Sequence, residues 1–228
     1  MARRCLECQY MDIVYLGHSC FKLRGKNAVV ITDPYDSEMV GLKLSKQQAD
    51  IVTVSHDHGD HNYLEAVKPK SEDHVVVFDT PGEFESKGVD VRGWRTYHDD
   101  KQGELRGKNI VYLIEVDGIR IVHLGDLGHM ISDEIIDALG DVGVLMVPVG
   151  GHYTIDAVMA MSIVKKLEPR IVVPMHYYDA GMNGEKFGEL APLSVFMKEA
   201  GVEVEPVEKL NLQVGSLPLD TTYVVLQS

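Results

Sequence analysis

The segment that most constrains this chain is a run of six residues that carries three histidines and two aspartates. It reads His56-Asp57-His58-Gly59-Asp60-His61 and directly follows the apolar residues 51–54. In an extended loop, residues two apart project to the same side, so His56 and His58 can face one ion while Asp60 and His61 turn toward a second. Imidazole nitrogen combined with carboxylate oxygen suits zinc, manganese or iron better than calcium or magnesium. The sequence therefore predicts a metal site in a loop at the end of a strand.

Further candidate ligands stand after apolar or β-prone stretches elsewhere in the chain. They are His98, Asp126 and His176. Each can lie in a loop at the end of a strand, and loops on a rigid sheet are where reactive groups are usually presented. His98 has the least distinctive neighbours, and His123, His129 and His152 compete with it for a place in the site.

Short strands and helices are predicted to alternate along the chain, with no linker, low-complexity segment or short repeat. Strands are expected at residues 12–16, 19–23, 28–32, 51–54, 75–78, 89–94, 110–116, 119–124, 142–147, 171–173, 202–207, 210–214 and 222–226. Helices are expected from a Ser132 cap to Gly140, over residues 154–167 and over residues 192–200. Two sheets with helices outside them would explain this α/β order, but periodicity alone does not separate it from another mixed layering.

Five short strings follow one another along the chain. They are Thr32-Asp33-Pro34, His56 to His61, Tyr97-His98-Asp99, His123-Leu124-Gly125-Asp126 and Pro174-Met175-His176-Tyr177. In this order they resemble the metallo-β-lactamase superfamily of metal-dependent hydrolases, from Met11 onward. Residues 15–21 and 147–154 look like the small, single-domain branch that includes ascorbate-6-phosphate lactonase. The resemblance implies an αββα sandwich, two mixed β-sheets flanked by helices, with metals in a cleft along one edge of the sheets.

The same resemblance implies a ligand set for a binuclear centre. The first metal would be bound by His56, His58 and His98, the second by Asp60, His61 and His176, and both would be bridged by Asp126. The expected cofactors are two divalent transition-metal ions. Zinc is placed first, and manganese and iron are the alternatives, because the ligand set contains no thiolate that would select a soft ion.

Other residues are expected to complete the chemistry. A hydroxide that bridges the two metals would attack the substrate, and Asp60 would orient this nucleophile and accept its proton. His152 or Tyr177 would donate a hydrogen bond to the developing oxyanion. Asp33, His18 and Tyr177 are expected to lie around the ligands and orient them without binding metal. For His152 and His18, a packing role is the alternative.

Length and composition are those of a globular protein. With 228 residues, 45% hydrophobic and 25% charged, the chain is expected to form one domain over residues 11–228, and residues 1–10 are expected to be an N-terminal extension that need not be ordered. No stretch is long and apolar enough to cross a bilayer, and the N-terminus lacks the apolar core of a signal peptide. The three cysteines cannot build a disulfide framework. The expected location is the cytoplasm.

The charge of the chain restricts its partners. The net charge is −13, so a long nucleic acid would meet a repulsive average field. A small anion can still enter a metal-rich pocket, because bound dications outweigh the mean charge locally. The expected partner is a small-molecule substrate, anionic or ester-like, with no long nucleic acid and no membrane. The sequence leaves open whether the chain forms a homo-oligomer.

These observations predict a hydrolase that cleaves a small ester-like substrate, a lactone or a phosphodiester. A flavodiiron-type oxygen reductase is disfavoured, because it would carry a glutamate in place of His58. The alternative from a different class is a metal-binding sensor or interaction module on the same fold, without turnover.

Overall fold

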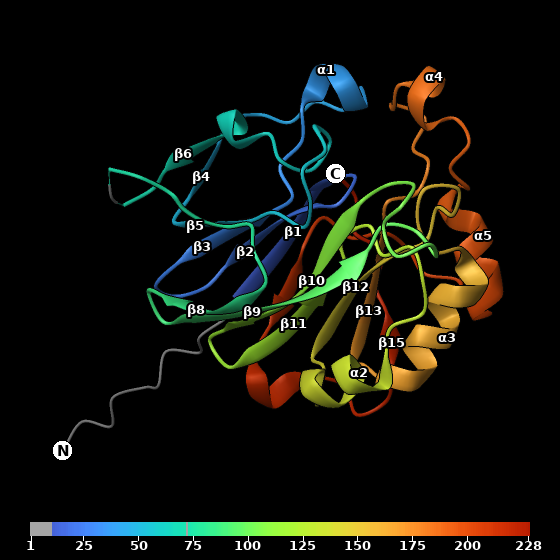
Figure 1. Cartoon of the computed structure of the whole chain (residues 1–228). Coiled ribbons are helices and arrows are strands. Elements are labelled where there is room, and N and C mark those ends of the chain that lie inside the picture. The colour runs from blue at the N-terminus through green and yellow to red at the C-terminus, as the bar shows by residue number, and fades with distance from the viewer. Residues whose placement is uncertain (1–10, 72) are drawn as a thin grey trace.

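The structure is a computed structural model that describes residues 11–71 and 73–228 (Figure 1). Its strands are β1 Met11–Gly17, β2 Cys20–Arg24, β3 Val29–Thr32, β4 Gln47–Ala49, β5 Ile51–Thr53, β6 Val67–Pro69, β7 Val76–Phe78, β8 Gly82–Ser86, β9 Val89–Tyr97, β10 Lys108–Val116, β11 Ile119–His123, β12 Val144–Pro148, β13 Ile171–Met175, β14 Leu210–Leu212 and β15 Thr222–Tyr223. Its α-helices are α1 Ser37–Val40, α2 Asp133–Leu139, α3 Ala157–Leu167, α4 Gly184–Phe187 and α5 Leu193–Ala200. Single 3-10 turns lie at Leu64–Ala66 and Val214–Ser216.

A six-stranded sheet has the order β14-β1-β2-β3-β5-β7. Successive residues of its inner strands are buried on opposite faces of the sheet. Val30 and Ile51 belong to the main core, which lies between the sheets, whereas Val29, Ile31 and Val52 belong to a second cluster on the other face. This alternation follows from the two-residue period of a strand. The second cluster also holds side chains from α1, β4 and the α4 region: Val40, Ala49, Met182, Phe187 and Leu190. The outer face of this sheet is therefore covered by short segments.

A seven-stranded sheet has the order β15-β13-β12-β11-β10-β9-β8. Strands β11, β12 and β13 are parallel, and α2 and α3 connect them, as parallel neighbours require. In α3 the residues Ala157, Ala160, Val164 and Leu167 are buried at helical spacing, so one face of this helix packs on the core. Figure 1 shows α3 and α5 side by side next to this sheet. The expected sandwich of two mixed sheets with flanking helices is confirmed.

Some element predictions were wrong. The strand expected at 202–207 does not form; only Val207 makes an isolated bridge, with Leu226, and Pro206 lacks the N–H that a ladder requires. Helix α3 begins at Ala157 and not at 154, because the side chain of Asp156 accepts from Met159 N and caps it there. The edge strand β8 was missed because Phe84 is the one large apolar residue among its five.

Within the described residues, no helix is long and apolar enough to span a membrane. The extension expected at residues 1–10 lies outside the described residues, and the single domain over 11–228 stays a prediction.

Candidate metal centre

The direction of the strands gathers the candidate ligands at one edge of the sandwich. In the six-stranded sheet, β1, β3 and β5 run the same way, since β2 is antiparallel to both of its neighbours and β3 is parallel to β5. In the other sheet, β9, β11 and β13 share a direction for the same reason. His18, Asp33 and the segment 56–61 follow strands of the first set, and His98, Asp126 and His176 follow strands of the second. Residues separated by more than a hundred positions therefore meet at the ends of strands.

The carboxylate of Asp33 fixes the loop after β5 through hydrogen bonds to two residues of that loop. The Asp33 carboxylate accepts from Ser55 N at 2.8 Å and from Ser55 Oγ at 2.5 Å, and it lies 2.9 Å from Nδ1 of His61. Ser55 Oγ also lies 2.9 Å from Nδ1 of His56. Both imidazoles therefore have their Nδ1 atoms occupied and turn Nε2 toward the centre of the cluster, the arrangement in which a hydrogen-bonded carboxylate orients a metal-binding histidine.

Asp126 is presented by a turn that only glycine fits. Gly125 has φ +55°, and a Cβ there would lie 2.3 Å from Asn109 Oδ1 and 2.6 Å from Ser55 Cβ. Asn109 Oδ1 accepts from Asp126 N at 2.9 Å, which fixes the backbone at this point. The glycine before Asp126 therefore lets the two sheets approach each other closely at the site.

The donors fall into two groups of residues. The first group is His56, His58 and His98, whose rings lie 4.5 to 5.2 Å apart by their centroids. The second group is His18, Asp60, His61 and His176, all buried, with one donor atom from each lying within 4.8 Å of the others. The first group is less enclosed, because His58 is exposed.

One oxygen of Asp126 joins the two groups. Its Oδ2 lies 3.0 Å from Nε2 of His176, 3.3 Å from Nε2 of His61, 3.2 Å from Nε2 of His98 and 4.0 Å from Nε2 of His56. Four imidazoles from both groups thus converge on a single buried carboxylate, the position from which one side chain can contact two ions.

The donor set fits a transition metal. In the described part of the chain, His56 Nε2, His61 Nε2 and Asp126 Oδ1 are buried and have no hydrogen-bond partner, although buried polar atoms are almost always paired. Burial, and then the nearby imidazoles, lowers the pKa of His56 and of His58, so both offer a neutral nitrogen. At His61 burial acts in the same direction, but the carboxylates of Asp126 and Asp60 outweigh it and raise the pKa, which shows that this point favours positive charge. A dication would satisfy both features.

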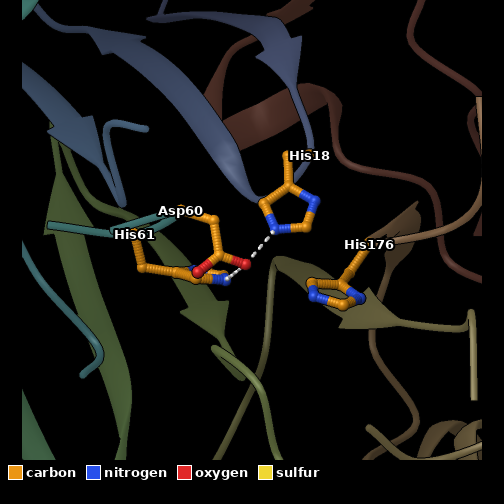
Figure 2. A group of neighbouring side chains, drawn as sticks. All are labelled: His18, Asp60, His61 and His176. Atoms are coloured by element: carbon orange, nitrogen blue, oxygen red, sulfur yellow. Dashed lines mark hydrogen bonds and ion pairs between the residues drawn. The ribbon is translucent and has the colours of Figure 1, made fainter. Parts of the chain in front are cut away.

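His18, a member of the second group, lies beside Asp60 and His176 (Figure 2). Its Nε2 lies 3.2 Å from Asp60 Oδ2, and its ring centroid lies 4.2 Å from that of His176. His18 and His176 both have left-handed backbones, with φ +57° and +51°, and His176 N donates to His18 O at 2.9 Å. Such strained residues persist where the surroundings hold them, often at functional sites. Burial lowers the pKa of His18 to about 4, so the imidazole is neutral at pH 7.

The two side chains predicted to donate to an oxyanion have neighbours outside the two groups of donors. His152 is exposed, and its Nε2 lies 2.9 Å from Glu189 Oε2. Tyr177 is buried with its ring 6.3 Å from that of Tyr15. Their proposed contact with an oxyanion stays a prediction. Of the competitors of His98, His123 lies 2.9 Å from Ser19 O and His129 accepts from Tyr97 N, so both have other partners.

A cavity of about 570 Å³ opens onto the cluster. It is lined by Met39, Asp57, His58, Gly59, Asp60, His98, Leu105, Arg106, Asp126, Tyr153, His176, Lys186 and Phe187. Among the lining residues, the sequence did not single out Arg106, Tyr153, Lys186 and Phe187. It also did not single out Ser55, whose hydroxyl contacts Nδ1 of His56. For Ser55 the signal was its position directly before His56, whereas the others carry no local pattern.

Comparison with known proteins agrees with this geometry. The model of the beta-lactamase superfamily domain matches residues 12–176. A metal-dependent hydrolase of Thermoplasma acidophilum is 30% identical over an alignment of 189 residues that covers 73% of this chain and 83% of that protein.

Solved structures extend the comparison. A Thermotoga maritima protein, whose crystal structure is assigned to a Zn-dependent hydrolase of the metallo-beta-lactamase superfamily, is 33% identical, with a TM-score of 0.75 and coverage of 95% of this chain and 98% of that one. The short form of human tRNase Z is 15% identical, with a TM-score of 0.56 over 74% of this chain and 93% of that one, which shows a shared fold alone.

Proposed function

The chain belongs to the metallo-β-lactamase superfamily and is a metal-dependent hydrolase, and from that premise we propose that it is a binuclear enzyme that cleaves a small ester-like substrate, a lactone or a phosphodiester. The observation that carries the proposal is the position of Asp126 Oδ2, within 4.0 Å of imidazoles from both groups of donors. A single metal site would not need a shared carboxylate.

In this proposal His56, His58 and His98 would hold the first metal and Asp60, His61 and His176 the second, with His18 beside the second set. Asp126 would be shared between the two sets. We propose zinc, with manganese and iron as alternatives, because imidazole and carboxylate suit all three. Bound metals would supply a water molecule of lowered pKa as the nucleophile and polarise the substrate oxygen that it attacks.

Asp60 is the residue best placed to guide the attack. It lines the cavity, and its Oδ2 lies 3.2 Å from His18 and 3.5 Å from His61. Burial alone would raise its pKa, but the imidazoles of His61 and His18 outweigh burial and hold the pKa well below the ordinary value. The carboxylate is therefore ionised and can accept a hydrogen bond from the attacking water. His18 would keep Asp60 in this orientation.

The test begins with metal content. Protein purified without added metal or chelator should contain two transition ions per chain by elemental analysis, and His176→Ala should lose one of them. His74→Ala removes an exposed histidine outside the cluster and serves as the matched control. One ion or none in the wild-type chain after reconstitution would overturn the binuclear proposal.

Hydrolysis is then measured on matched lactones and phosphodiesters with each metal restored. Asp60→Ala should abolish the hydrolysis found in the wild-type protein while it keeps at least one ion. A metal-loaded wild-type protein that hydrolyses nothing in a broad panel would instead support a sensor or interaction module.

A further inference from the structure

Two cationic side chains stand at the mouth of the cavity that contains the metal cluster. Arg106 and Lys186 line this cavity, together with the apolar side chains of Met39, Leu105 and Phe187. The whole chain carries a net charge of −13, and Asp57, Asp60 and Asp126 line the same cavity, so Arg106 and Lys186 are the lysine and arginine side chains that offer positive charge there. A local cluster of cations at a cleft attracts anionic ligands whatever the net charge of the protein.

Within the part of the chain that the structure describes, neither cation is paired with a carboxylate. Among the described residues, no carboxylate forms an ion pair with Arg106 or Lys186, whereas the exposed Lys166 pairs with Asp133 at 2.8 Å. On its other side Arg106 lines a second cavity of about 540 Å³. The guanidinium is therefore free to bind a ligand that enters from the mouth.

The loop that carries Arg106 is built around a buried carboxylate. Asp99 Oδ1 accepts from Lys101 N at 2.8 Å and from Gly103 N at 2.9 Å. Its Oδ2 accepts from Leu105 N at 3.0 Å and from Arg106 N at 2.7 Å. Four backbone hydrogen bonds to one side chain give the loop a defined shape, and Asp99 directly follows His98 of the metal cluster. The position of Arg106 is thus tied to that of a metal ligand.

Tyr153 contacts both of the segments that carry the two cations. The guanidinium carbon of Arg106 lies 5.5 Å from the centroid of the Tyr153 ring, within the range of a cation–π contact. The Tyr153 hydroxyl donates to the backbone oxygen of Lys186 at 2.8 Å. Because Tyr153 also lines the cavity, it holds the two segments against the same opening.

We propose that Arg106 and Lys186 bind a carboxylate or phosphate group of the substrate while its ester-like bond lies against the metal cluster. This inference rests on the proposed function and narrows its substrate class to small esters, lactones or phosphodiesters that carry a second, non-reacting anionic group. A guanidinium binds carboxylate and phosphate oxygens in pairs, and a lysine adds a compact positive charge.

The first experiment compares two esters with the same leaving group. Metal-loaded protein is assayed with p-nitrophenyl acetate, which is neutral, and with mono-p-nitrophenyl glutarate, which carries a carboxylate. The ratio of their kcat/KM values should favour the glutarate in the wild-type protein and fall by about 10- to 100-fold in Arg106→Gln/Lys186→Gln, because charged hydrogen bonds are lost for one ester only. An equal loss for both esters, or an unchanged ratio, would overturn the proposal.

Matched controls are Arg92→Gln and Lys165→Gln, which remove exposed cations that do not line the cavity. They should leave the ratio unchanged. Asp99→Asn should lower the ratio less than Arg106→Gln does, because it loosens the loop without removing the charge. Metal content is measured for every variant, and a fall in metal content excludes that variant from the comparison.

A second measurement keeps the anion site testable if the wild-type protein hydrolyses neither ester, an outcome that counts against the proposed function. Glutarate and inorganic phosphate are titrated separately into metal-loaded protein by calorimetry, which also shows which of the two anions is preferred. The affinity for at least one should fall in Arg106→Gln/Lys186→Gln and not in the controls. Equal affinities in all proteins would refute the anion site.

Discussion

Two buried carboxylates of this protein, Asp50 and Asp126, have opposite surroundings. Asp50 is 2% exposed and its oxygens are occupied: Val29 N donates at 2.9 Å, Lys87 Nζ lies at 3.0 Å, Lys70 Nζ lies at 3.5 Å, and Ser71 Oγ donates as well. Asp126 is 1% exposed, yet its Oδ1 has no hydrogen-bond partner in the described part of the chain, and its Oδ2 faces imidazoles.

The difference separates a structural charge from a functional one. A buried charge is costly unless it is paired and hydrogen-bonded, and the protein itself pairs Asp50 with two lysines. At Asp126 the neighbours are mainly imidazoles, and several of these have nitrogens without a hydrogen-bond partner among the described residues. The Asp50 cluster is complete without a ligand, whereas the Asp126 cluster has the composition of a site that a cation completes.

The strongest way to break this comparison is to remove Asp126. Asp126→Ala should lower metal content below one ion per chain and lower kcat/KM by about 10³-fold, because both groups lose their shared ligand. Retention of two ions would contradict the shared role of Asp126.

Metal removal should change the free energy of unfolding through the Asp126 cluster and not through the Asp50 cluster. Stripping the wild-type protein with a chelator should lower its free energy of unfolding by about 4 kcal/mol for each ion lost, when the bound state is measured at a metal concentration 1,000 times the dissociation constant of that site. Asp50→Asn should show the same metal-dependent difference, and Asp126→Ala almost none. Denaturant unfolding with and without metal measures all three. An equal difference in Asp126→Ala would show that the metal binds elsewhere.

Changing His18 tests whether this residue is a working part of the Asp126 cluster. His18→Gln should weaken binding of the second metal or lower activity by about 10- to 100-fold, the usual effect of losing a group that orients a ligand. If His18 only positions Asp60, both ions should remain bound at saturating metal. If it binds the ion directly, one ion should be lost, as in His176→Ala. Wild-type affinity and activity would show that His18 only packs against its neighbours.

Replacing Asp50 tests the Asp50 cluster, whose charges are paired without a ligand. Asp50→Asn should lower the free energy of unfolding of the metal-free protein by roughly 2 kcal/mol, because charged hydrogen bonds to buried groups are lost. Metal content and kcat/KM should match those of the wild type. A loss of metal would show that the two clusters are not independent.

The effect of Asp50 should also depend on pH. Burial raises its pKa, but hydrogen bonds from Ser71 and Lys87 outweigh burial and lower the pKa to about 2. Because this lies below the ordinary value of about 3.9, the stabilisation is complete above that value and is lost as the pH falls toward 2. The difference in Tm between metal-free wild type and Asp50→Asn should therefore shrink between pH 5 and pH 2.5. A growing difference would contradict this assignment.

Local patterns predicted much of the fold. Strands such as β1, β3 and β10 lie close to the positions expected from runs of β-prone residues, and α2 begins at the Ser132 cap as expected. The prediction failed at 202–207, where a proline interrupts an alternating run, and at β8, whose residues carry no apolar signal. Each failure occurred at an edge or terminus, where pairing with a neighbour decides the outcome and periodicity is weak.

The sequence by itself determined the chemistry of the site, because the strings around His56, Asp126 and His176 each combine a strand end with a metal-binding residue type within a few positions. Only the tertiary structure decided which groups meet. It brought His18 to Asp60, 42 positions away, and brought Arg106, Tyr153 and Lys186 together from two loops and helix α4, while His152 lies against Glu189. The physical reason is that residue type and strand ends are local properties of a chain, whereas the closing of two sheets and the paths of their loops are set by packing between distant segments.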